Sequence, residues 1–282
     1  MKSGWLAAAL LAAALLLPDT GCSPAAGRPA SAAAAPSRAE EVSSAPPLSE
    51  APASSSGTAV SSSGPALSSA PDQPPADPSF LDDAVFVGDS VTLKLKNYVT
   101  QRRKSDPSFF GKARFLTAGS MGSGNALQPV GENSIHPLYN GEKALLEDSA
   151  AKMGAKKVYL MLGINDLAPY GVDGAAANLE KLGLRFLQKQ PGASVWVQSA
   201  TPMLQKKQMR TLNNQNIAEY NGRLREICRK EGWAFLDIAS VLSDAQGALK
   251  PEYCSDPDDL GLHFTDEACE IWIRYILTHT KA

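Results

Sequence analysis

The sequence contains few of the residues that would indicate a metal centre, a disulfide scaffold or a nucleic-acid surface. Its 282 residues include three histidines and four cysteines. None of these forms a Cys-x-x-Cys pair or a His/Cys cluster with metal spacing. The formal net charge is only -2, and the basic residues are scattered, which argues against a nucleic-acid partner. We therefore expect neither a metal ion nor a cofactor.

The N-terminal apolar run, Trp5 to Leu17, is too short to span a bilayer comfortably. It follows Lys2 and is typical of a signal peptide, which we place at residues 1–21. Cys22 comes next, and this arrangement resembles the bacterial lipoprotein signal, in which the cysteine becomes the lipidated first residue. Asp19 stands where such signals usually have Leu, so an ordinary signal peptide cut at a nearby Ala-rich site is the alternative.

Residues 22–79 consist almost entirely of Ala, Ser, Pro and Gly. Such a segment has too little apolar area to offset the entropy of ordering it, which predicts a disordered tether. A flexible chain of about 55 residues has an r.m.s. reach on the order of 40 Å. We expect an exported protein, anchored to the cell membrane through a lipid at Cys22 and facing the cell wall or the outside.

Residues 80–282 are of single-domain size, and strand-like and helical patterns alternate along them. The strand-like runs are apolar throughout, as in strands covered on both faces. This alternation predicts an α/β domain: a three-layer sandwich with a five-stranded parallel sheet. The expected strands are 84–87, 113–117, 157–162, 194–199 and 234–238. Helical patterns cover 141–153, 172–190, 212–231 and 265–279 and also begin directly after Ser90, and Thr265 is a candidate N-cap.

Polar and Gly-rich segments follow the expected strands. In parallel sheets, functional residues collect in the loops after the carboxyl ends of the strands, so these segments can converge on one edge. They are 88–90, 118–125, 163–166 and 200–203, together with 258–265 before the last helix.

Four of these segments, read in order, resemble the four blocks of the SGNH, or GDSL-type, esterase and lipase family. They are Gly88-Asp89-Ser90, the Gly-rich loop, Gly163-Ile164-Asn165-Asp166 and Gly261-Leu262-His263. The resemblance covers about residues 84–275 and implies a flavodoxin-like fold and hydrolysis of carboxylic esters without a cofactor.

A serine hydroxyl needs a base to become a nucleophile, and His263 is the obvious candidate to activate Ser90. His136 stands beside Pro137, and His279 is near the chain end. The resemblance implies an oxyanion hole that is made of the Ser90 N–H, a glycine N–H of the second loop and the Asn165 side chain. For the glycine it favours Gly122, with Gly119 as the alternative.

The acid that orients the histidine is where the sequence departs from the family. The family usually has Asp three residues before the His, and that position is Leu260 here. We expect Asp259 to orient His263 through a one-residue bulge. Asp258, Asp256 or a backbone carbonyl are the alternatives.

The expected substrate is a small-molecule or glycan ester of a short acyl group, because the sequence has no long apolar insertion that could line a fatty-acyl tunnel. A soluble lipid or a thioester is the alternative. For an enzyme facing the wall we expect O-acetyl groups on a carbohydrate or peptidoglycan. Tyr170 is a candidate substrate contact, and a surface turn is equally consistent with its position. An acyltransferase or a non-catalytic glycan-binding module are the rival readings, and we expect the domain to be monomeric.

Three cysteines lie in the domain. Cys228 falls on the apolar face of an expected helix, which predicts a buried free thiol. Cys254 and Cys269 bracket His263, and in an exported protein they could form a disulfide.

Overall fold

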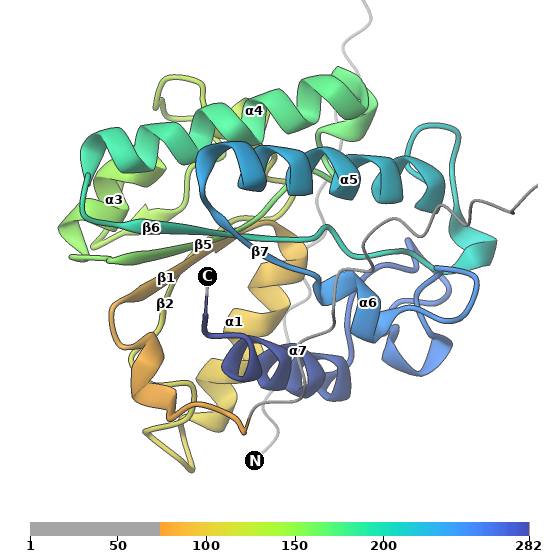
Figure 1. The fold of residues 1–282 in the computed structure, drawn as a ribbon, viewed down its shortest axis with the longest axis horizontal. Coiled ribbons are helices and arrows are strands. Elements are labelled where there is room, and N and C mark those ends of the chain that lie inside the picture. The colour runs from red at the N-terminus through yellow and green to blue at the C-terminus, as the bar shows by residue number, and fades with distance from the viewer. Residues whose placement is uncertain (1–73, 282) are drawn as a thin grey trace, which may run out of the picture. The chain divides into compact units, whose positions relative to one another are not determined.

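The computed structural model describes residues 74–281 (Figure 1). The expected signal peptide, Cys22 and residues 22–73 of the expected tether lie outside the described residues. Packing starts slightly before residue 80, because the N–H of Ala76 donates to the carbonyl of Leu277 at 2.8 Å. Asp77 then caps a short 3-10 helix, η1 (Pro78–Leu81).

The predicted five-stranded parallel sheet is confirmed. Its order is β2-β1-β5-β6-β7, and every pair is parallel. Strand β1 is buried at every residue, as its unbroken apolar sequence requires. The bounds are β1 (Ala84–Gly88), β2 (Arg114–Thr117), β5 (Lys157–Met161), β6 (Ser194–Gln198) and β7 (Ala234–Leu236).

Helices cover both faces of this sheet, which confirms the three-layer arrangement (Figure 1). One face carries α3 (Leu146–Lys152), α4 (Leu167–Lys189) and α5 (Asn214–Glu231), and the other carries α1 (Ser90–Arg102) and α7 (Asp266–Thr278). Two short helices, α2 (Ser123–Ala126) and α6 (Ile238–Leu242), lie in connections.

The strand order reverses at β1, which has β2 on one side and β5 on the other. In open parallel sheets a ligand crevice forms at such a reversal, outside the carboxyl ends of the strands. Ser90 directly follows β1, and Asn165 comes shortly after β5. The topology thus brings the first and third predicted segments to the same edge.

The predicted helix 141–153 is wrong in its first half. A two-stranded hairpin, β3 (Leu138–Tyr139) and β4 (Glu142–Lys143), extends into that stretch, and the helix starts only at Leu146. Asn140 and Gly141 form its turn with φ of 51° and 82°, the conformation that favours Asn-Gly in hairpins.

Other helix boundaries lie closer to expectation. Helix α4 begins at Leu167, before the predicted residue 172, and its backbone breaks at Gly171. Thr265 caps α7 by accepting the N–H of Ala268, as predicted. Between residues 74 and 281, the helices lack the combination of length and hydropathy that a membrane span requires.

All three cysteines of the domain are free, so the disulfide between Cys254 and Cys269 that the sequence left open is not formed. The Sγ of Cys254 lies 3.3 Å from a carboxylate oxygen of Asp256. Cys269 is fully buried on α7. Cys228 is buried on α5, as its place on the apolar face predicted.

Candidate active site

Ser90 lies at the turn between β1 and α1. Asp89 caps the helix by accepting the N–H of Val91 at 2.9 Å. The turn is tight enough to require glycine before it, because a Cβ on Gly88 would lie 2.0 Å from Oγ1 of Thr92. As the first residue of α1, Ser90 has a backbone N–H with no acceptor inside that helix.

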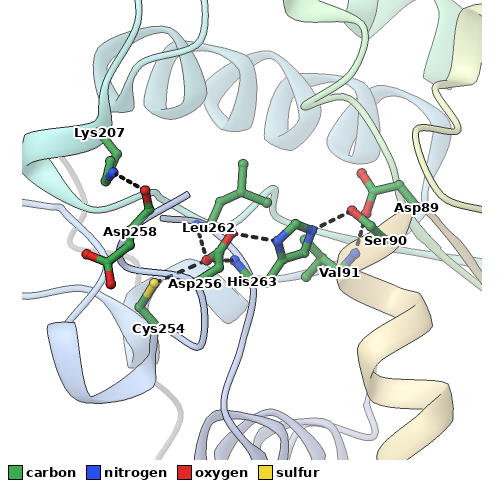
Figure 2. A network of polar contacts seen from close by, with 9 residues as sticks. All are labelled: Asp89, Ser90, Val91, Lys207, Cys254, Asp256, Asp258, Leu262 and His263. Carbon is green, nitrogen blue, oxygen red and sulfur yellow. Dashed lines mark hydrogen bonds and ion pairs between the residues drawn. The ribbon is translucent and has the colours of Figure 1, made fainter. Parts of the chain in front are cut away.

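The structure brings His263 to Ser90 across 173 residues of sequence. The imidazole Nε2 lies 2.9 Å from the Ser90 Oγ, and Nδ1 lies 2.7 Å from Oδ2 of Asp256 (Figure 2). A serine, a histidine and a carboxylate in this order can move the serine proton to the imidazole while the carboxylate fixes the tautomer.

Asp256, one of the alternatives named above, orients His263 in place of Asp259, so the prediction of Asp259 is wrong. The chain from 256 to 263 turns back on itself, and the carbonyl of Asp256 accepts the N–H groups of Asp259 and Gly261. This turn leaves Asp259 exposed. Asp258 is exposed too; its carbonyl accepts Lys207 Nζ at 2.8 Å (Figure 2).

The second oxygen of Asp256, Oδ1, holds the same turn together. It accepts the N–H groups of Leu262 and His263 at 3.0 and 2.9 Å and contacts Sγ of Cys254. Burial raises the pKa of Asp256, but the hydrogen bonds from His263 and Cys254 outweigh it, and the pKa lies below its usual value. Asp256 is therefore ionised at neutral pH and can stabilise a positively charged imidazole.

The predicted segment 200–203, which is not one of the four family blocks, lies next to the turn that carries His263. Directly after it, the N–H of Leu204 donates to the carbonyl of Gly261 at 2.8 Å. The side chain of Asn214, at the start of α5, binds both the N–H and the carbonyl of Met203. These hydrogen bonds link the segment both to the turn of His263 and to α5, and so help to hold that turn in place.

The second segment presents a buried Gly122 and an exposed Gly119. A Cβ on Gly122 would lie 2.6 Å from Oδ1 of Asp166, whereas a Cβ on Gly119 would meet nothing within 4 Å. The Gly122 N–H donates to Oδ1 of Asn125 at 2.8 Å. Sequence reasoning missed Asn125, although its position three residues after Gly122 fits a helix-capping side chain.

Asn165 joins the first and second segments. Its Nδ2 donates to Oδ2 of Asp89 and to the carbonyl of Met121, both at 3.2 Å. These are the neighbours of Ser90 and of Gly122 in the chain. The three residues predicted to form the oxyanion hole thus come together at one edge of the sheet.

Two carboxylates lie buried behind this edge. Burial raises the pKa of Asp89 to about 6, although the N–H of Val91 and the charge of His263 lower it. Burial also raises the pKa of Asp166, against hydrogen bonds from Gly124 and Ser123.

Tyr170 flanks the second segment on its solvent side. Its ring packs against the backbone of Gly124, where an added Cβ would lie 2.3 Å from Cε2. The residue is 46% exposed. Nearly half of this aromatic residue is thus open to solvent beside the loop of Gly122.

Solved structures with a similar fold come from several bacteria. One is a Streptococcus pneumonia protein assigned as a platelet activating factor, with a TM-score of 0.52 and 18% identity over 72% of this chain and 89% of that one. A GDSL-like lipase from Bacteroides thetaiotaomicron has a TM-score of 0.51 and 17% identity over 69% and 86%. An acetyl-xylooligosaccharide esterase from Geobacillus stearothermophilus has a TM-score of 0.50 and 15% identity over 71% and 94%.

No match was found among curated proteins. The model of the GDSL-like lipase/acylhydrolase family matches residues 86–271, which include Ser90, Gly122, Asn165, Asp256 and His263. Together with this fold, the match shows that the chain belongs to the GDSL-like lipase/acylhydrolase family and is a carboxylic ester hydrolase.

Proposed function

We propose that this protein is an extracytoplasmic serine esterase that removes short acyl groups, above all O-acetyl groups, from a carbohydrate or cell-wall glycan. The observation that carries the proposal is the unbroken hydrogen-bonded chain from Asp256 through His263 to Ser90. The missing aspartate at position 260 was the one sequence feature that favoured a non-catalytic module. Asp256 supplies that carboxylate, so this reading loses its support.

In the proposed reaction His263 accepts the Ser90 proton as the hydroxyl attacks the ester carbonyl. The imidazolium that forms lies against the ionised Asp256, which stabilises it. The alcohol leaves with the proton from His263, and a water molecule activated by the same imidazole then releases the acid from Ser90.

Negative charge develops on the carbonyl oxygen and needs donors aimed at it. The Ser90 N–H, the Gly122 N–H and the Asn165 amide are the proposed donors. In the free enzyme the Gly122 N–H is engaged by Asn125, and the two Asn165 amide hydrogens by Asp89 and the Met121 carbonyl. The substrate oxygen therefore replaces Asn125 Oδ1 and the Met121 carbonyl on binding, while Asp89 keeps its hydrogen bond to Asn165. A neutral hydrogen bond of this kind contributes about 0.5–1.5 kcal/mol net, which a bound substrate can offset.

A glycan as the alcohol part of the ester is supported by Tyr170. Its exposed ring beside Gly124 offers an apolar face with a polar tip, which suits the mixed surface of a sugar. A protein with the same fold is an acetyl-xylooligosaccharide esterase, so the fold is compatible with such substrates.

The proposed location rests on the N-terminal sequence, with lipidation at Cys22 and a tether that holds the domain away from the membrane. Metabolic labelling with a palmitate analogue tests it. We expect label on the wild type and none on Cys22→Ala. Equal labelling of both would exclude the anchor.

The activity is tested with p-nitrophenyl esters of increasing chain length, beside acetylated xylan and peptidoglycan. We expect the acetyl ester to be the best of the series and acetate to be released from a glycan. Ser90→Ala should abolish both reactions, and activity retained by this variant would contradict the mechanism. Addition of an acceptor glycan separates a hydrolase from a transferase, because only the transferase forms an acylated acceptor.

A further inference from the structure

Asp89 and Asp166 are not used in the mechanism above, although both are almost completely buried, at 2% and 1% exposure. Neither pairs with a Lys or Arg side chain anywhere between residues 74 and 281. Burial of a carboxylate without a cation costs free energy. The presence of two such carboxylates next to the loops that carry Ser90, Gly122 and Asn165 therefore requires an explanation.

Asp166 binds the second segment directly after Gly122. Its Oδ2 accepts the N–H and the hydroxyl of Ser123 at 2.7 and 3.0 Å, and its Oδ1 accepts the N–H of Gly124 at 2.9 Å. The carboxylate fills the space where Gly122 would carry a Cβ. Movement of Asp166 would therefore shift the peptide that carries the Gly122 N–H.

Asp89 binds the third segment in a corresponding way. One oxygen caps α1 through the N–H of Val91, and the other accepts the amide of Asn165. The carboxylate next to the nucleophile thus holds the Asn165 side chain, while the carboxylate next to Asn165 holds the Gly122 loop.

We propose that Asp89 and Asp166 are positioning residues that preorganise the oxyanion hole, Asp89 by orienting the Asn165 amide and Asp166 by fixing the Gly122 loop. The inference rests on the proposed esterase function. Both oxygens of each group accept hydrogen bonds, as in an ionised carboxylate, whereas a protonated carboxyl group carries an O–H donor on one of them. Asparagine in their place would set an N–H against the N–H donors that they now bind.

The first test is the kinetics of Asp166→Asn with p-nitrophenyl acetate. Loss of one oxyanion donor lowers kcat by about 10²–10³-fold in a serine hydrolase, and we expect a fall of about 10²-fold with KM changed less than about 3-fold. A trifluoromethyl ketone forms a tetrahedral oxyanion adduct on the serine, so its inhibition constant should rise in parallel with the loss in kcat.

The matched control is Glu147→Gln, which removes the charge of another buried carboxylate. Glu147 lies on α3 and pairs with Arg185 in the C-terminal half of α4, and Arg185 also donates to the carbonyl of Leu127 at the end of α2. We expect its kcat to stay within about 2-fold of the wild type, because a neutral amide oxygen can still accept from Arg185.

The second test does not depend on esterase activity. Amide hydrogen exchange in the wild type should show protected N–H groups at Ser123 and Gly124, and Asp166→Asn should exchange them at least about 10-fold faster. Unchanged exchange, or a folded Asp166→Asn with kcat within about 3-fold of an active wild type, would overturn the proposal. An inactive wild type would instead contradict the esterase function.

Discussion

The Nδ1 of His263 lies 2.7 Å from Oδ2 of Asp256, a residue seven positions earlier in the chain. The intervening residues form a turn that the same carboxylate stabilises through the N–H groups of Leu262 and His263. Asp256 therefore builds the turn that brings it to the imidazole. This double role explains how the orienting acid can be displaced from its usual position in the family.

The first prediction concerns this carboxylate. Asp256→Asn leaves His263 without an ionised partner, and loss of such a partner costs up to about 10⁴-fold in kcat in a serine protease. Since Asp256 also holds the turn, we expect kcat for p-nitrophenyl acetate to fall by at least about 10²-fold. Asp259→Asn is the control and should stay within about 2-fold of the wild type. The reverse order of effects would return the role to Asp259.

The second prediction separates the two glycines of the second segment. Gly122→Ala places a methyl group against Asp166 at a distance that real Cβ atoms do not show, so the loop must shift. We expect kcat to fall about 10²-fold, in the range for loss of one oxyanion donor. Gly119→Ala adds a methyl group in open space and should keep near-normal kcat. A larger loss for Gly119→Ala would assign the donor to that residue.

The third prediction concerns stability against pH at Asp89. Because the folded-state pKa is about 6 and the ordinary value is 3.8, the unfolded chain releases this proton at lower pH than the folded chain. The stability that Asp89 contributes is therefore complete below about pH 4 and is lost as pH rises to about 6. A pKa difference of this size corresponds to a change of about 3 kcal/mol in the free energy of unfolding.

Asp89→Asn removes this titration and retains an oxygen that can cap α1. We expect the unfolding free energy of the variant, relative to the wild type, to rise between about pH 4 and pH 7. Denaturant unfolding at a series of pH values measures it. At pH 8 the variant should be at least as stable as the wild type and yet less active, because Asn165 loses its acceptor. A difference that does not change with pH would contradict the raised pKa.

The fourth prediction concerns the sugar part of the substrate. Tyr170→Ala removes the exposed ring, and one aromatic contact contributes about 0.5–1.5 kcal/mol, so kcat/KM for an acetylated xylooligosaccharide should fall about 3–10-fold. The value for p-nitrophenyl acetate should change little, because this ester has no sugar. Leu184→Ala, at 43% exposure on the same helix, is the control and should affect neither substrate. Equal losses on both substrates would mean that Tyr170 acts through the Gly122 loop.

Much of this protein could be predicted from short stretches of sequence. Unbroken apolar runs alternating with helical patterns determine a parallel sheet covered on both faces, because each run must be buried. Ser90 and Asn165 follow their strands closely, and the sheet brings such loops to one edge. His263 could be identified because the other two histidines lie in unsuitable positions.

The tertiary structure decided what depends on contacts between distant segments. Gly122 differs from Gly119 because Asp166 packs against it and Asn125 binds its N–H. Asp256 was selected over Asp259 by a turn whose hydrogen bonds run back to Asp256 itself. A sequence pattern shows which residues are available and how far apart they stand in the chain. It does not show how a loop folds back on itself, and that path decides which carboxylate reaches the imidazole.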